Sequence, residues 1–112
     1  MLTATLSVTP GETALGLSLT VENESDESVE LDFTDAQRAE FVAVDADSGE
    51  EVWRWSDGRM FGQVLGTETL SPGETLERDV EWQTESSGSY RIEGRLVANE
   101  HRPSAEMVVE LE

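Results

Sequence analysis

The side chains that most often perform catalysis are scarce in this chain of 112 residues. It has no cysteine, and its only histidine, His101, stands beside Arg102 and Pro103 in an expected loop. Nucleophilic catalysis needs a nucleophile and a base held within hydrogen-bonding reach of each other, and no pattern in the sequence indicates such a pair. We interpret His101 as a surface residue. The sequence predicts a protein that is not an enzyme and that uses no cofactor.

Carboxylates are abundant, but they identify no active site. With 25 Asp and Glu residues, some pair will lie at a glycosidase-like separation by chance. Residues 45–50, DADSGE, resemble a calcium-binding loop because alternating carboxylates and a glycine can wrap a hard cation. The spacing of an EF-hand is not kept, however, and the run joins two apolar segments. We therefore expect a hairpin turn in which Gly49 supplies a positive φ, with an adventitious cation site as the alternative.

The chemistry of recognition is concentrated in residues 56–63, which follow two closely spaced tryptophans. Exposed apolar groups with a polar rim mark recognition surfaces. A recognition segment works best when it is rigid and exposed, and here Arg59 or Met60 could enter a pocket of a partner with Phe61 as an apolar anchor. In the alternative, Met60 and Phe61 turn inward to cap the fold and Arg59 balances nearby carboxylates. The candidate partner-binding residues are Ser56, Arg59, Met60, Phe61 and Gln63.

The charge of the chain is strongly one-sided. Its net charge is −18, and all seven basic residues are arginine. Repulsion at this density disfavours a compact state at low ionic strength, but at molar salt the Debye length falls to about 3 Å. We therefore expect a salt-accumulating cytoplasm, with an acidic surface that mimics nucleic acid or docks on a basic protein as the alternative. Direct nucleic-acid binding is disfavoured, because affinity for phosphate depends on neutralisation by Lys and Arg that a chain of this net charge cannot supply.

Length and hydropathy bound the organisation and the location. The chain has the size of one domain, and we expect a single domain over residues 1–112. No apolar stretch approaches the ~20 residues of a membrane-spanning helix, and the first ten residues lack the basic and apolar regions of a secretion signal. Without cysteine there is no disulfide framework. These features predict a cytoplasmic protein that does not contact membranes.

The elements that must position the candidate residues are predicted to be strands. Apolar and polar residues alternate with a period of two in segment after segment. These segments are residues 2–8, 15–21, 29–33, 52–55, 76–82, 90–96 and 105–111, and a short apolar run lies at residues 41–44. Turn signals such as Pro10-Gly11 and Ser71-Pro72-Gly73 separate them, and no βαβ unit is visible. The pattern predicts an all-β, antiparallel sandwich of about seven to nine short strands.

One local pattern favours an immunoglobulin-like sandwich over a barrel. In that fold a tyrosine near the start of the penultimate strand anchors a corner with its hydroxyl, two residues ahead of an inward position. Tyr90, with Ile92 in the inward position, fits this arrangement. Trp53 and Trp55 alternate on one face of their strand, and we expect both at the centre of the core. Together with Trp82 and Tyr90 they form the expected aromatic core.

Several of these motifs also occur together in one known family. The V-W-R-W-S element at residues 52–56 is followed by Phe61-x-Gln63, and Leu70-x-Pro72-Gly73-Glu74 and Trp82 come later. Val21-x-Asn23 and Val29-x-Leu31-x-Phe33 precede them. Over roughly residues 15 to 98 the chain resembles the BsuPI-type intracellular proteinase inhibitor family, in an acidic, halophile-like version.

The resemblance implies both a fold and a partner. The fold it implies is an immunoglobulin-like sandwich, and the activity is inhibition of cytoplasmic serine proteinases, with a subtilisin-like enzyme as the candidate partner. A protein-interaction or assembly domain of the same fold without inhibitory activity remains the alternative, because a rigid loop on a sandwich serves either role.

Overall fold

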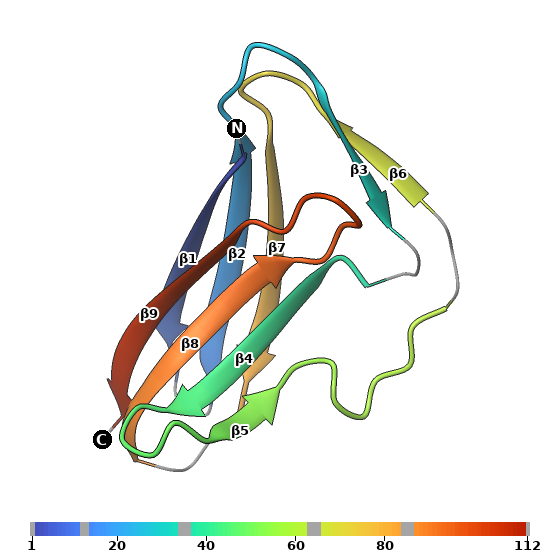
Figure 1. The fold of residues 1–112 in the computed structure, drawn as a ribbon. Coiled ribbons are helices and arrows are strands. Elements are labelled where there is room, and N and C mark those ends of the chain that lie inside the picture. Colours follow the sequence, from blue (N-terminus) through green and yellow to red (C-terminus); the bar gives the residue numbers. More distant parts are fainter. Residues whose placement is uncertain (1, 12–13, 34–36, 63–65, 84–86, 112) are drawn as a thin grey trace.

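The computed structural model describes residues 2–11, 14–33, 37–62, 66–83 and 87–111 (Figure 1). These residues form nine strands and no helix, so none of them lies in a helix that could span a membrane. The strands are β1 (Leu2–Pro10), β2 (Leu15–Asn23), β3 (Val29–Phe33), β4 (Ala39–Asp45), β5 (Glu51–Arg54), β6 (Gly66–Leu70), β7 (Thr75–Trp82), β8 (Gly88–Leu96) and β9 (Ser104–Leu111).

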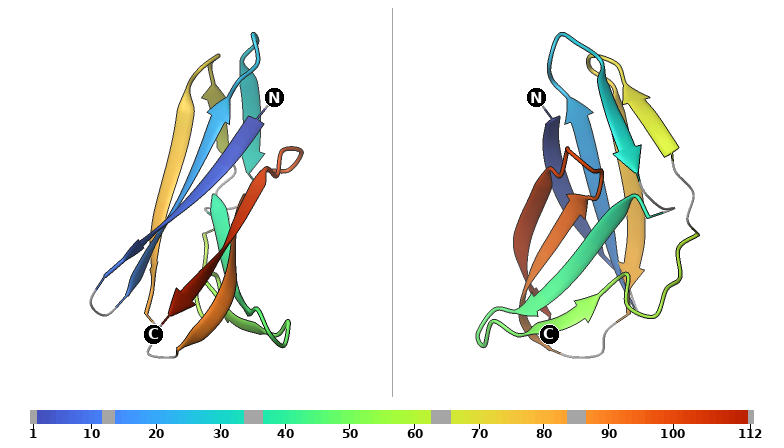
Figure 2. Two further views of the ribbon diagram at one scale, coloured as in Figure 1. Left: turned by 90° about the vertical axis from the view of Figure 1, so that its left-hand side faces the viewer. Right: turned by 45° about the vertical axis from the view of Figure 1, so that its right-hand side comes forward.

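The strands pair into two larger sheets and a short ribbon. One sheet has the order β1-β2-β7 and the other the order β5-β4-β8-β9, while β3 pairs with β6. Every pairing is antiparallel. Figure 2 shows the two larger sheets facing each other, with β1 in contact with β9 on one side. The predicted immunoglobulin-like sandwich is therefore confirmed, and β5 and β7 are the outer strands on its other side.

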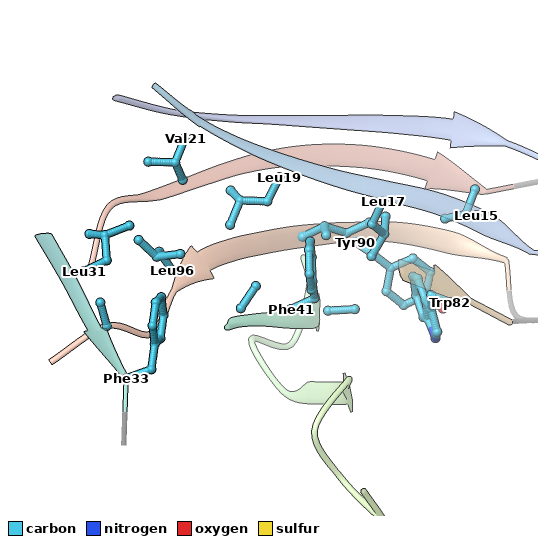
Figure 3. Packing of buried hydrophobic residues seen from close by; sticks show 14 of the residues in the cluster. Leu15, Leu17, Leu19, Val21, Leu31, Phe33, Phe41, Trp82, Tyr90 and Leu96 are labelled. Atoms are coloured by element: carbon cyan, nitrogen blue, oxygen red, sulfur yellow. The ribbon is translucent and has the colours of Figure 1, made fainter. Parts of the chain in front are cut away.

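The core lies between the facing sheets and follows the predicted alternation. In β2 the side chains of Leu15, Leu17, Leu19 and Val21 are all buried, whereas the polar residues between them are not (Figure 3). Strand β8 repeats the pattern with Ile92 and its neighbours at spacing two. Each fully buried aliphatic side chain of this kind contributes about 1.5–3 kcal/mol to the hydrophobic stabilisation of the fold.

Eight of the nine strands that the structure describes correspond to predicted segments, and β6 is the one that was not predicted. Its sequence, GTETL, contains a single apolar side chain, Leu70, so it carries almost no alternation signal. It forms because β3 supplies a partner along its whole length, from Val29 opposite Leu70 to Phe33 opposite Gly66. Pairing with β3 thus determines the conformation of a segment whose own sequence pattern does not indicate a strand.

The aromatic residues divide between the core and its margin. Trp82 and Tyr90 belong to the buried cluster, whereas Trp53 and Trp55 are partly buried and pack against it. Trp53 stacks on Trp82 at 5.6 Å, and Trp82 meets the Tyr90 ring edge-on at 5.3 Å. The two tryptophans of residues 52–55 share the inward face as expected, but they lie at the edge of the core, because β5 is an outer strand.

Two turns of the structure correspond to features of the sequence. The Tyr90 hydroxyl donates to the carbonyl oxygen of Ser87 at 3.1 Å, just before β8 begins. Between β4 and β5 the Asp45 N–H donates to the Glu50 carbonyl at 2.8 Å, and Gly49 has a φ of 78°. The expected hairpin turn over DADSGE is confirmed.

Candidate functional site

The candidate site is formed by residues 56–61, which we call the recognition segment. It begins two residues after β5 ends at Arg54, and it lies at one side of the molecule in Figure 1. A turn opens it: the Asp57 N–H donates to the Arg54 carbonyl, and the Arg59 N–H donates to the Ser56 carbonyl, both at 3.1 Å. Gly58 makes this turn at a φ of 76°, which favours glycine.

The first residue of the recognition segment is held by a buried carboxylate. Glu40 of β4 is only 5% exposed, and its Oε1 accepts the Ser56 N–H at 3.1 Å while its Oε2 accepts the Ser56 hydroxyl. The same carboxylate also accepts the Phe41 N–H at 3.1 Å and the Gln37 amide at 3.4 Å, and the Arg54 guanidinium lies 3.6 Å away. A buried charge is tolerated when it is paired and hydrogen-bonded, as this one is. Ser56 is therefore fixed to the central part of the sheet.

The far part of the recognition segment is held by one residue, Trp55. The Arg59 Nε donates to the Trp55 carbonyl oxygen at 2.9 Å, and the guanidinium carbon lies 4.7 Å from the centroid of the indole ring. The Phe61 ring packs against the same indole, with centroids 5.6 Å apart. Cation–π and tilted aromatic contacts at these distances are favourable. Both neighbours of Met60 thus contact Trp55.

Met60 itself has 99% of its surface exposed. The alternative in which it turns inward to cap the sandwich is therefore wrong. Phe61 is partly buried against Trp55, and Arg59 is exposed but engaged by Trp55. The structure thus brings together Ser56, Arg59, Met60 and Phe61, whereas Gln63 lies outside the described residues.

A shallow hollow of about 750 Å³ lies beside the recognition segment, against the outer strand β7. Trp53, Trp55 and Arg59 line one part of it, and Asp79 and Glu81 of β7 line another. A smaller hollow of about 150 Å³ shares the Trp55 wall and reaches Phe41. The segment therefore stands at the rim of a groove into which a contacting partner could extend.

Sequence reasoning missed Glu40, although a signal was present. Glu40 directly precedes the apolar run 41–44, and a strand buried on both faces gives its polar members no access to water. Arg54 also forms an ion pair with Glu51. The hydrogen bond from Arg54 lowers the pKa of the exposed Glu51 carboxyl, and the same bond to Glu51 raises the pKa of Arg54. The Arg54 guanidinium contacts Glu51 at 2.6 Å and thereby links it to Glu40.

Comparison with known proteins finds similar folds among solved structures. The GH3 β-glucosidase of Bifidobacterium adolescentis is 14% identical with a TM-score of 0.52, and the match covers 99% of this chain and 17% of that one. β-Glucosidase 3B of Thermotoga neapolitana, in complex with α-D-glucose, is 12% identical with a TM-score of 0.53, over 98% of this chain and 16% of that one. The β-glucosidase of Kluyveromyces marxianus is 10% identical, also with a TM-score of 0.53, over 100% and 14%.

These likenesses show the fold alone, because this chain spans only about a sixth of the length of the glucosidases and shares few residues with them. Among curated proteins none matches the chain. Residues 2–101 match the model of the family described as BsuPI, intracellular proteinase inhibitor.

Proposed function

This chain belongs to the BsuPI family of intracellular proteinase inhibitors, and on that basis we propose that it binds a proteinase and restrains it through the recognition segment. It acts by binding and not by catalysis. The enzyme we expect as its partner is a cytoplasmic, subtilisin-like serine proteinase.

The observation that carries the proposal is the setting of Met60. Its side chain is 99% exposed, while the residues on both sides of it are held by Trp55. A segment ordered before binding loses little conformational entropy when a partner engages it, so more of the contact energy appears as affinity. This is the property that a substrate-like inhibitor requires.

The same geometry selects between the two candidate side chains. The Arg59 guanidinium is engaged by the carbonyl oxygen and the ring of Trp55, and releasing it would break both contacts. Met60 makes no comparable demand, and its flexible thioether chain adapts to an apolar pocket. We therefore assign Met60 to the primary specificity pocket of the proteinase, with Arg59 and Phe61 supporting it.

The proposal is tested by titrating the protein against several subtilisin-like proteinases in molar KCl, with a short peptide substrate. We expect inhibition at micromolar protein or below, competitive with the substrate, because the segment would occupy the substrate cleft. If no such enzyme is inhibited at micromolar concentration, the inhibitory function is rejected. The fold would then serve as an interaction domain without inhibitory activity.

A further inference from the structure

The two residues that flank Met60 are held by the same residue, and this arrangement bears on what happens after a proteinase attacks. We propose that Trp55 is a positioning residue that keeps both sides of the Met60–Phe61 peptide bond in place when that bond is cut. The inference rests on the function proposed above. It makes the protein an inhibitor that survives its own cleavage.

The cleavage step itself is an ordinary hydrolysis performed by the serine proteinase. The C–N bond between Met60 and Phe61 breaks, one water molecule is consumed, and the new ends are a Met60 carboxylate and a Phe61 amino group. In a flexible substrate these ends diffuse apart, because the gain in chain entropy favours separation. An inhibitor that holds them together leaves the reverse reaction, in which the bond reforms and water is released, open to the same enzyme.

The contacts needed for this hold lie on opposite sides of the bond. On the Met60 side, Arg59 is hydrogen-bonded to the Trp55 carbonyl at 2.9 Å and lies over the indole ring. On the other side, the Phe61 ring contacts the same indole, with centroids 5.6 Å apart. Neither contact passes through the Met60–Phe61 bond, so its hydrolysis removes neither of them.

Trp55 can act in this way because it is itself fixed. Its N–H donates to the Phe41 carbonyl oxygen of β4 at 2.9 Å. The next residue, Ser56, is bound to the buried carboxylate of Glu40 on the same strand. Trp55 and the residue after it are therefore both attached to the central part of the sheet, and these attachments fix the position from which the indole extends. A side chain on a mobile loop would move with the cut ends instead of retaining them.

The test compares wild-type protein with Trp55→Ala and Trp55→Phe, each incubated with a subtilisin-like proteinase in molar KCl. Inhibition is followed over time, and the intact mass of the chain reports cleavage of the Met60–Phe61 bond. We expect wild-type protein to keep inhibiting while cut and uncut chains coexist. Trp55→Ala should lose its inhibition at least about tenfold faster, with a smaller loss of initial affinity, because the cut ends separate. Trp55→Phe should restore most of the lifetime, since it retains an aromatic ring.

The separation between initial affinity and lifetime distinguishes positioning from a general loss of stability. Arg59→Ala provides a second variant that removes only one of the two contacts and leaves the indole in place, should Trp55→Ala fail to fold. We call this holding of the cut ends by Trp55 the clamp. If wild-type protein inhibits, and inhibition by Trp55→Ala and by Arg59→Ala lasts as long as inhibition by wild-type protein, the clamp is rejected and the proposed function stands.

If wild-type protein inhibits nothing, the proposed function fails but the clamp is still tested. A broad-specificity proteinase is then added in trace amount, and cutting at 60–61 is compared with cutting in the β4–β5 hairpin turn of the same molecule. If Trp55 acts as a clamp, proteolytic cutting of the Met60–Phe61 bond should increase in Trp55→Ala, whereas cutting in the hairpin turn should not change. Equal cutting in the variant and in wild-type protein would overturn it.

Discussion

The carboxylate of Glu40 accepts hydrogen bonds from both the backbone N–H and the hydroxyl of Ser56, sixteen residues further along the chain. It thereby attaches the first residue of the recognition segment to the strand next to β5. This buried carboxylate fixes the position at which residues 56–61 leave the sheet. The rigidity that the proposed inhibition requires therefore depends on a residue outside the segment.

Glu40→Gln should destabilise the fold even though it preserves the shape of the side chain. The amide has one acceptor oxygen in place of two, and its NH₂ group would face the donors of Ser56 and Arg54. We expect a loss of about 1–3 kcal/mol in the free energy of unfolding, measured by denaturant titration in molar KCl. Glu110→Gln, at an exposed position on β9, is the matched control. Equal stability of the two variants would show that Glu40 is not an anchor.

Salt should stabilise this protein strongly. Its net charge of −18 is spread over 112 residues, and screening removes the repulsion that favours expansion. We expect the melting temperature to rise steeply as KCl increases from tens of millimolar to molar. A melting temperature independent of KCl would contradict the expectation of a salt-accumulating cytoplasm.

The tryptophans of the core and of its margin should differ in their effect on stability. Trp82 is 5% exposed and lies between Trp53 and Tyr90, so Trp82→Ala should cost about 3–5 kcal/mol. Trp53→Ala should cost clearly less, because Trp53 is only partly buried. Denaturant unfolding of both variants in molar KCl provides the comparison. A larger loss at Trp53 than at Trp82 would mean that the core is centred on β5.

The pair formed by Glu51 and Arg54 should give a pH-dependent contribution. The pKa of Glu51 is lowered in the folded state, chiefly by the hydrogen bond from Arg54, so its stabilising effect is present above the unfolded pKa. That effect is lost as the pH falls through the folded pKa, below the usual value of about 4.5. The difference in melting temperature between wild-type protein and Glu51→Gln should therefore shrink as the pH is lowered from neutral into this range. A difference in melting temperature that does not change with pH would show that the ion pair of Glu51 and Arg54 does not stabilise the fold.

The sequence predicts the sandwich well because its strands alternate so regularly. The four buried apolar side chains of β2 have a spacing of two, and such a pattern is typical of a strand with one inward face. Strand β6 escapes prediction, because GTETL has one apolar residue and owes its conformation to β3. The local pattern of residues determines β2, whereas long-range pairing determines β6.

The candidate site is harder to predict for a different reason. An apolar pair such as Met60 and Phe61 in a loop is compatible with an exposed or an inward position, and only tertiary contacts decide between them. The structure separates the pair: Met60 is exposed, whereas Phe61 contacts Trp55. The anchor Glu40 lies in another strand, and no local pattern connects it with Ser56.

The measurement that tests the inhibitory role of the recognition segment most directly is the inhibition constant of Met60→Ala against a subtilisin-like proteinase that the wild-type protein inhibits. Burial of a methionine side chain contributes about 1.5–3 kcal/mol, so its loss should weaken inhibition by roughly ten- to a hundredfold. Val108→Ala, another exposed apolar residue, on β9, is the control and should inhibit like wild-type protein. If Met60→Ala inhibits as strongly as the control at an unchanged melting temperature, Met60 does not enter the specificity pocket, and the recognition segment is not the inhibitory one.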